Sequence, residues 1–381
     1  MLNLDADLAQ RVHAISESRT FRVFSLARQL RQEGKQIISL AVGEPDFPTP
    51  EPVIAATRQA LAEQQTRYGD VAGLEPLRDK LAEALPSCHR RNILVANGAK
   101  QALFSIFQVL CDAGDEIIIP KPCWVSFEEQ IKLAGARSVF VETVDHQLDP
   151  QRIEEAVSPR TRAILVNSPN NPTGAVYTAD SLAAVARIAE RNGLYIISDE
   201  AYHAFTYDHH THVPIRQVAQ DPDRVITVRS FSKHYNMTGF RIGYVAAHER
   251  IIQALTRLQG HVCGNVCTFA QYGALAALQM DQQIVARRRA DLQQRRDLAL
   301  ASSTGLFECI KPGGAFYIFA DISRHLPQYG SSENFAMHLL HRAGVAVVPG
   351  EAFGGPGHIR ISFGAAESEL RAAFEKIKEV I

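Results

Sequence analysis

Residues 225–244 read VITVRSFSKHYNMTGFRIGY, and this segment decides the fold. Its first four residues are apolar without alternation, which predicts a strand covered on both faces. Lys233 follows this strand closely, and burial there would lower the pKa of its amine and favour the neutral, nucleophilic form. Ser230 and Arg241 add a hydroxyl and a guanidinium, both suited to a phosphate. The segment therefore predicts a nucleophilic lysine beside an anion site.

Similar apolar runs recur between residues 90 and 250 and alternate with amphipathic helical patterns. The strand-like runs are residues 116–119, 138–141, 163–166, 195–198, 225–228 and 243–246, and the helical patterns include residues 101–110, 126–133, 180–190 and 249–258. This alternation predicts an open, mostly parallel α/β sheet. After residue 268 the pattern is mainly helical. It then continues through GGAFYIFADI, a helical segment near residues 335–343, VAVVPG and HIRISFG, which predicts a second, α+β layer. We expect the first 40 or so residues to join that layer or to reach a partner subunit.

The bulk composition limits the class of protein. The chain has 381 residues, which favours one large and one smaller domain. A formal net charge of -1 gives no global attraction to nucleic acid or to an anionic membrane. The six cysteines form no CxxC pair, the first ten residues do not resemble a signal peptide, and no apolar run is long enough to span a membrane. We therefore predict a cytoplasmic protein without a disulfide framework.

Two further strand ends carry polar side chains, and ligands bind beyond such ends in doubly wound sheets. Residues 195–203, YIISDEAYH, place Asp199 and Glu200 after a strand. A buried carboxylate there would have a raised pKa unless it met a cation such as a protonated pyridine nitrogen. The alternative is that Asp199 caps the next helix. In ILVNSPNNPTGAVY, residues 164–177, Asn171 would donate its amide to an anionic phenolic oxygen, although such turns also occur as plain loops.

A fourth strand end, ILVANGAKQALF at residues 93–104, opens a helix through a turn of small residues. The turn contains Gly98, Ala99 and Lys100. Free N–H groups and the positive end of the helix dipole favour a phosphate at this position. Taken alone, the segment also fits an ordinary strand-to-helix turn.

These segments, together with four others, resemble the signature blocks of the class I aminotransferases. The blocks are AVGEPDFPTP, RYGDVAGLEPLR, NGAKQAL, NSPNNPTG, SDEAYH, SFSKHYNMTGFRIGY, PGGAFY and HIRISFG, and they stand in that family's order from about residue 40 to residue 365. The chain most resembles the bacterial aspartate aminotransferases. The resemblance implies the pyridoxal-phosphate (PLP) transferase fold of type I. Its expected parts are an N-terminal arm with part of the small domain (residues 1–45), a large PLP-binding domain (46–280) and a small C-terminal domain (281–381).

The resemblance also implies a set of residues that bind the cofactor. Lys233 would hold PLP through a Schiff base and then act as general base and acid. Asp199 would pair with the pyridine nitrogen, and Asn171 and Tyr202 would bind the ring oxygen. Trp124 would stack on the ring, and the phosphate would be held by Gly98, Ala99, Lys100, Ser230 and Arg241. Tyr68 would reach the phosphate of the neighbouring subunit, so a homodimer with shared active sites is part of the prediction.

For the substrates, the resemblance implies that Arg360 binds the α-carboxylate, with Gly43 in backbone contact and Trp124 and Asn171 nearby. An acidic substrate needs a second cation, and Lys100 is the candidate; the alternative is a solvated lysine in the first turn of a helix. We therefore expect a ping-pong transfer of the amino group from aspartate to a 2-oxo acid such as 2-oxoglutarate.

Other activities remain as alternatives. An aromatic, methionine or kynurenine-type aminotransferase would use the same scaffold, as would a PLP-dependent β-lyase of cysteine conjugates, which releases pyruvate and ammonia. A nicotinamide dehydrogenase is disfavoured because no GxGxxG motif follows the first strand. Ala99 and Cys123 depart from residues common in the family, and Cys123 would reshape one side of the pocket.

Three features are given structural interpretations. His209, His210 and His212 lie in a polar turn without a second ligand cluster, so we predict no metal site. Cys263 and Cys267 are predicted to be small core or pocket-lining residues. The arginines at 287–289 and 295–296 are predicted to form a solvated helix face rather than a nucleic-acid site.

Overall fold

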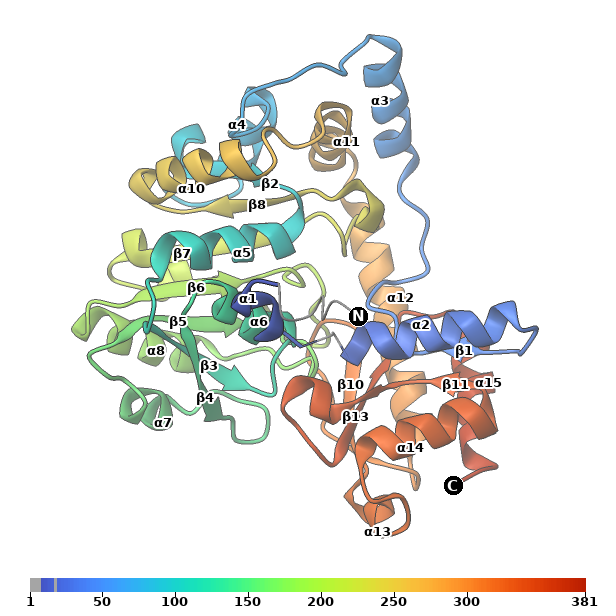
Figure 1. The fold of residues 1–381 in the computed structure, drawn as a ribbon. Coiled ribbons are helices and arrows are strands. Elements are labelled where there is room, and N and C mark those ends of the chain that lie inside the picture. The colour runs from blue at the N-terminus through green and yellow to red at the C-terminus, as the bar shows by residue number, and fades with distance from the viewer. Residues whose placement is uncertain (1–7, 17–18) are drawn as a thin grey trace, which may run out of the picture.

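A seven-stranded sheet forms the larger layer of the computed structural model, which describes residues 8–16 and 19–381 (Figure 1). The strand order is β2-β8-β7-β6-β5-β3-β4. The strands are β2 (Ile93–Ala96), β3 (Glu116–Lys121), β4 (Arg137–Glu142), β5 (Thr161–Asn167), β6 (Tyr195–Asp199), β7 (Val225–Ser230) and β8 (Gly243–Ala246). All neighbours from β7 to β4 are parallel, and β8 alone runs antiparallel to the strands beside it. The predicted, mostly parallel sheet is confirmed.

Helices cover both faces of this sheet, which explains why its strands are apolar throughout. In β5, Ala163 and Leu165 face a core shared with α5, α6 and α10, whereas Ile164 and Val166 face a core shared with α7, α8 and α9. The helices are α5 (Gly98–Leu110), α6 (Ser126–Leu133), α7 (Pro150–Glu155), α8 (Ala179–Arg191), α9 (Ile215–Val218) and α10 (Glu249–Val262). The helical patterns at 101–110, 126–133, 180–190 and 249–258 are confirmed.

A third group of helices covers the β2–β8 edge of the sheet, at the top of Figure 1. It consists of α3 (Glu51–Ala62), α4 (Glu75–Glu83) and α11 (Thr268–Gln279). Leu77 and Leu81 of α4 and Ala270 and Ala274 of α11 pack with Val95 of β2 in one buried cluster. This packing fixes the position of the loop between α3 and α4.

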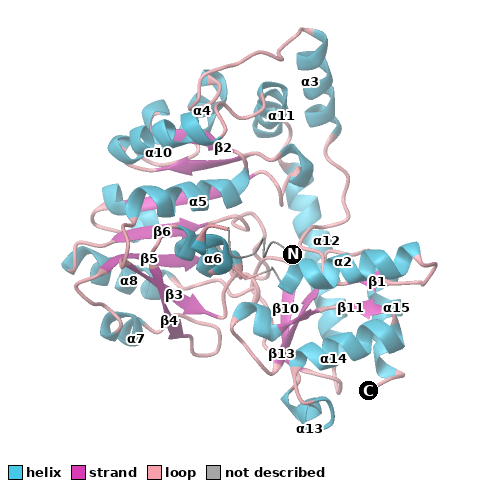
Figure 2. Ribbon diagram, in the orientation of Figure 1, coloured by secondary structure: helices cyan, strands magenta, loops and turns pink. Residues whose placement is uncertain are grey.

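The second layer is smaller and mixes short strands with helices (Figure 2). Its strands are β9 (Glu308–Cys309), β10 (Tyr317–Asp321), β12 (Val348–Pro349) and β13 (His358–Ser362), in the order β12-β13-β10-β9, with a separate parallel pair of β1 (Ile38–Ser39) and β11 (Val345–Ala346). Its helices are α12 (Gln283–Ser303), α13 (Leu326–Tyr329), α14 (Ser332–His338) and α15 (Glu367–Lys378), and α14 continues as the π-helical segment Leu339–Ala343. The predicted α+β layer is present, and so is the helical segment expected near residues 335–343.

Where the structure describes it, the N-terminal segment joins the second layer, the first of the two arrangements predicted for it. Helix α2 (Arg19–Gln32) lies against the second layer, and β1 pairs with β11. The short helix α1 (Gln10–His13) precedes Ser16, whose N–H donates to Glu129 Oε2 of α6 at 2.8 Å. The predicted domain limits at residues 45 and 280 stay a prediction.

One interpretation of surface residues holds only in part, and another is wrong. Arg287 and Arg289 of α12 are exposed, as predicted. Arg288 and Arg296 of α12 are buried, because α12 packs between the layers: Arg288 donates to Asn236 Oδ1 at 3.2 Å, and Arg296 pairs with Asp208 at 2.9 Å. Cys263 and Cys267 are exposed, because they flank the junction of α10 and α11 rather than sharing one helix face.

Neither a membrane span nor a metal cluster is found in the described part of the chain. None of its helices is both long and apolar enough to cross a bilayer. No three His, Cys, Asp or Glu side chains among these residues converge as ligands. His209 and His210 stack on each other, and His212 Nε2 instead lies 3.2 Å from Glu200 Oε2.

Candidate active site

A cavity of about 580 Å³ lies where the carboxyl ends of β5, β6 and β7 meet the second layer. The last residues of these strands, Asn167, Asp199 and Ser230, all line it. Eleven predicted site residues line the same cavity: Gly43, Ala99, Lys100, Trp124, Asn171, Asp199, Tyr202, Ser230, Lys233, Arg241 and Arg360. Parallel strands bring their carboxyl ends to one edge, so side chains far apart in sequence meet there.

Lys233 lies buried in the wall of the cavity. Its Nζ donates to the carbonyl oxygen of Gly43 at 2.6 Å. Burial lowers the pKa of Lys233 to about 8, against the opposing effect of the nearby Glu44. About one tenth of the amine is therefore neutral at pH 7, far more than for an ordinary lysine, and this neutral form is the nucleophile.

Asp199 is the buried carboxylate of the cavity. Its Oδ1 accepts the N–H of Ala201 at 3.1 Å, and burial raises its pKa to about 7. The chain then forms turns, and the next helix begins only at Ile215, so the alternative of a helix cap is wrong. A carboxylate in this setting stays ionised only if a cation binds against it.

Asn167 joins two of the strand ends, and it is not among the predicted site residues. Its Nδ2 donates to the carbonyl oxygen of Asp199 at 3.0 Å, and its Oδ1 accepts the N–H of Asn171 at 3.0 Å. The side chain is buried. Its place as the first asparagine of the NSPNNPTG block was the available signal.

Arg360 enters the cavity from β13 of the second layer. Its guanidinium donates to Asn171 Oδ1 at 3.0 Å and to the carbonyl oxygen of Ala41 at 2.7 Å. The guanidinium also lies 4.4 Å from the ring centre of Tyr317 and 5.0 Å from that of Phe353. Its Nε is buried without a hydrogen-bond partner among the described residues. This arginine therefore retains a donor that a bound carboxylate would satisfy.

Gly98 and Arg241 form the anion-binding end of the cavity. Gly98 has φ +78°, and a Cβ atom on it would lie 2.4 Å from Arg241 Nη2. Arg241 itself is left-handed, with φ 57°, and donates to the carbonyl oxygen of Thr238 at 2.8 Å. The glycine thus lets the guanidinium approach the first turn of α5, where N–H groups lack helical partners.

Lys100 lies beside Trp124 at the mouth of the cavity. Its Nζ is 5.0 Å from the centre of the indole ring. Burial, and then the neighbouring Arg241, lower the pKa of Lys100. Within the described residues no carboxylate pairs with this amine, which is thus available to an anion in the cavity.

Glu200, the residue after Asp199, does not line the cavity and instead takes part in a buried ion-pair cluster. Glu200 is completely buried and accepts from Arg229 Nε at 2.9 Å and Nη2 at 2.8 Å, and from Ser198 Oγ at 3.0 Å. Burial by itself would raise the pKa of Glu200, but His212 and Arg229 together lower it. The two neighbouring carboxylates therefore have separate surroundings, and only Asp199 is left for a ligand.

Comparison with known proteins agrees with this geometry. The sequence profile described as aminotransferase class I and II matches residues 35–377. The chain belongs to this family. It is 37% identical to an aspartate aminotransferase of Geobacillus stearothermophilus, over 97% of the chain and 98% of that protein. It is also 39% identical to the aspartate/prephenate aminotransferase of Thermus thermophilus, over 98% of each. The structure of a Thermus thermophilus aspartate aminotransferase with maleate superposes with a TM-score of 0.94, at 40% identity, over 98% of this chain and 99% of that one.

Family membership confirms the predicted fold, PLP-dependent fold type I, and implies PLP as the cofactor of this aminotransferase. The residues present fit that group in three respects. Asp199 is a buried carboxylate that needs a cation, Gly98 leaves the space that Arg241 occupies above the helix start, and Lys233 presents a buried amine of lowered pKa. Two predicted cofactor residues do not line the cavity: Gly98, which is buried next to Ala99 and Arg241, and Tyr68, which is 99% exposed.

The ion pair behind the site of this aminotransferase leads to a stability prediction. Arg229→Met leaves the buried Glu200 carboxylate without its cation, so we expect a loss of about 3–5 kcal/mol in the free energy of unfolding. The double variant Arg229→Met/Glu200→Gln removes both charges, and we expect it to recover most of that loss. Urea unfolding of the apoproteins at pH 7 measures both. An equal loss in the single and double variants would show that packing, not charge, is what Arg229 contributes.

Proposed function

We propose that this protein is a PLP-dependent aminotransferase that transfers the amino group of an L-amino acid, with aspartate preferred, to a 2-oxo acid such as 2-oxoglutarate by a ping-pong mechanism. The observation that carries the proposal is the convergence of Lys233, Asp199 and Arg360 in one cavity. An amine, a buried carboxylate and a guanidinium with a free donor are the groups that amino-group transfer on PLP requires. The relatives named as aspartate aminotransferases support the substrate.

The roles of the cavity residues follow from their positions. When bound, PLP supplies an electron sink that weakens the bonds at the substrate α-carbon. Asp199 pairs with the pyridine nitrogen and keeps it protonated, which also relieves the cost of burying the carboxylate. Lys233 binds the cofactor and then carries a proton at Nζ. Asn171 and Tyr202 bind the ring oxygen, and Trp124 covers the ring.

The phosphate group is held by the anion-binding end of the cavity. The first turn of α5, at Gly98, Ala99 and Lys100, offers N–H groups, and Ser230 and Arg241 add a hydroxyl and a guanidinium.

Arg360 orients the substrate through its α-carboxylate. The hydrogen bond that its guanidinium gives to Asn171 Oδ1 turns the Nδ2 donors of that amide toward other acceptors. Asn171 can then contact the ring oxygen, while Arg360 binds the carboxylate. Gly43 lines the same cavity, and its carbonyl oxygen accepts a hydrogen bond from Lys233.

Lys100 binds the side-chain carboxylate of aspartate. The amine faces the cavity without an anionic partner in the described structure, and a dicarboxylate would provide one. The similar Thermus thermophilus enzyme was solved with maleate, which is itself a dicarboxylate.

The visible spectrum with PLP tests the central proposal. We expect the purified protein to show a Schiff-base band that aspartate and glutamate convert to the pyridoxamine form, and Lys233→Ala to lack the band. Because the lowered lysine pKa provides neutral amine at lower pH, the rate at which the apoprotein captures PLP should rise with pH and level off above about 8. The matched control is Lys132→Ala, which changes a lysine paired with glutamates on α6.

No band with added PLP would refute the proposed function. Conversion by cysteine conjugates with release of pyruvate and ammonia, without need of an oxo acid, would assign a β-lyase instead.

Lys100→Met tests the acidic substrate. We expect kcat/KM for aspartate to fall by about tenfold, because the charge pair with the side-chain carboxylate is lost, while kcat/KM for phenylalanine stays the same or rises. Steady-state kinetics with both donors measures the ratio. An equal fall for both donors would contradict a contact with the side-chain carboxylate.

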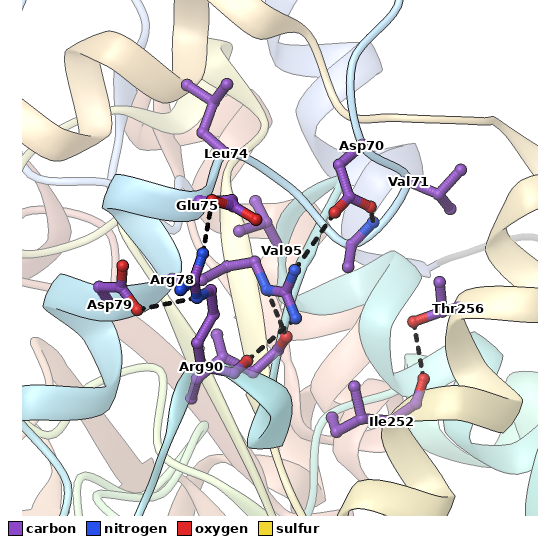
Figure 3. Close-up of polar contacts among 12 residues, drawn as sticks. Asp70, Val71, Leu74, Glu75, Arg78, Asp79, Arg90, Val95, Ile252 and Thr256 are labelled. Atoms are coloured by element: carbon purple, nitrogen blue, oxygen red, sulfur yellow. Dashed lines mark hydrogen bonds and ion pairs between the residues drawn. The ribbon is translucent and has the colours of Figure 1, made fainter.

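The site also requires a second copy of the chain, with Tyr68 reaching the phosphate of the partner. Tyr68 is fully exposed on a loop that the structure holds firmly. Thr268 Oγ1 donates to the carbonyl oxygen of Arg67 at 3.1 Å, and Gln259 Nε2 donates to that of Val71 at 2.8 Å. Arg78 donates to Asp70 Oδ2 at 3.4 Å, as Figure 3 shows. An exposed tyrosine on so well anchored a loop is typical of an interface residue.

Sedimentation equilibrium tests the homodimer. We expect a mass twice the 42.0 kDa of the chain. A mixed dimer of one Tyr68→Phe subunit and one Lys233→Ala subunit should retain activity at one site. That site takes Lys233 from the first subunit and Tyr68 from the second, so neither change is present in it. A monomer with full activity would refute the shared site.

A further inference from the structure

Tyr317 is part of the wall of the cavity, although the sequence offered no role for it. It begins β10, directly after the segment PGGAF, and is 1% exposed. It lines the cavity from the second layer, opposite the strand ends of the large sheet. Three of the residues assigned to the reaction contact it.

The first contact joins two phenols. The hydroxyl of Tyr317 lies 3.0 Å from the hydroxyl of Tyr202, and the two rings meet edge to face at 5.7 Å. In the described structure each hydroxyl has the other as its hydrogen-bond partner. One hydroxyl must donate and the other accept, since each carries a single hydrogen. If Tyr317 donates, the hydrogen of Tyr202 remains free to point into the cavity.

The second contact supports Arg360. Register pairs Tyr317 with Ser362 and Phe319 with Arg360, so Tyr317 and Arg360 are diagonal neighbours on β10 and β13. The guanidinium lies 4.4 Å from the centre of the phenol ring. This cation–π contact holds one face of the guanidinium while Asn171 and Ala41 fix its edge.

The third contact is with the backbone that holds the lysine. A Cβ atom on Gly43 would lie 3.0 Å from the Tyr317 hydroxyl, and the carbonyl oxygen of Gly43 accepts from Lys233 Nζ. The phenol thus lies against the glycine without space for a side chain between them.

We propose that Tyr317 is a positioning residue with two separable functions: its hydroxyl donates to Tyr202 and so directs the hydrogen of Tyr202 toward the ring oxygen of the cofactor, and its ring holds Arg360 in place for a carboxylate. This inference rests on the proposed function. A donor on the ring oxygen favours the deprotonated form of the bound chromophore. Loss of the Tyr317 hydroxyl therefore weakens that donor and moves the pH midpoint of the visible band upward.

Two variants separate the functions. Tyr317→Phe keeps the ring and removes the hydroxyl, so we expect the pH midpoint of the PLP band to rise by about 0.5 to 1 unit. The dissociation constant for maleate, a non-reacting dicarboxylate, should remain within about twofold of wild type, since the ring under Arg360 is kept. Tyr317→Met removes the ring but fills a similar volume, so we expect maleate to bind about tenfold more weakly.

A double-mutant cycle and a matched control complete the design. In a Tyr202→Phe background, Tyr317→Phe should cause no further shift of the midpoint, because the hydroxyl acts through Tyr202. Tyr207→Phe is the control: its buried hydroxyl donates to the carbonyl oxygen of Ala315 in the same core but does not line the cavity. It should leave both the midpoint and the affinity for maleate unchanged.

The outcomes that overturn the inference differ from those that refute the function. The role of the hydroxyl is overturned if Tyr317→Phe leaves the pH midpoint of the PLP band at its wild-type value. It is also overturned if Tyr317→Phe shifts the midpoint equally in the wild-type and Tyr202→Phe backgrounds. Unchanged maleate affinity in Tyr317→Met overturns the role of the ring, and if that variant does not fold, Tyr317→Leu replaces it in the same measurement. A wild-type protein with no band at all would refute the proposed function instead.

Discussion

Burial of ionisable groups at the carboxyl ends of the central strands is the constraint on which the rest of the site depends. Asp199 ends β6 and Lys233 follows β7, and both line one cavity, where burial disfavours the charged form of each. The carboxylate is left short of a cation, and the amine loses its proton more readily than an ordinary lysine does. Burial of these two groups costs stability when the site is empty, and a bound cationic ring with an electrophilic carbon would offset that cost. The same constraint explains why the neighbouring Glu200 turns the other way and pairs with Arg229.

The two layers contribute different chemistry to the cavity. The large sheet supplies the groups assigned to the cofactor, since its parallel strands end together and the first turn of α5 lies beside them. The second layer supplies Arg360 and Tyr317 from adjacent antiparallel strands. The groups proposed to bind the substrate thus come in part from the second layer, which meets the cofactor side of the cavity through packing and through hydrogen bonds. The hydrogen bond from Arg360 to Asn171 is a direct link between the layers.

Incorrect interpretations of the sequence share one cause. Arg288 and Arg296 lie in a polar, arginine-rich stretch that is typical of a solvated helix, yet α12 runs between the layers and both side chains are buried with partners. Cys263 and Cys267 have helical spacing, yet both lie in the connection between α10, which ends at Val262, and α11, which begins at Thr268. Local spacing does not show which elements will cover a segment from outside, and burial depends on that cover.

The sequence by itself determined the sheet, its flanking helices and most of the cavity. Short apolar runs that alternate with helical patterns favour strands covered on both faces, and motifs at the ends of parallel strands meet at one edge. The convergence of Lys233, Asp199, Asn171 and Arg241 was therefore predictable from the chain alone. Only the tertiary structure decided how the second layer completes the site. The contacts of Tyr317 with Tyr202 and Arg360, and those of Asn167 with Asp199, join residues that no periodicity connects. The contact between Tyr317 and Tyr202 depends on how the layers pack, because two side chains 115 residues apart come within hydrogen-bond distance only after both layers have folded.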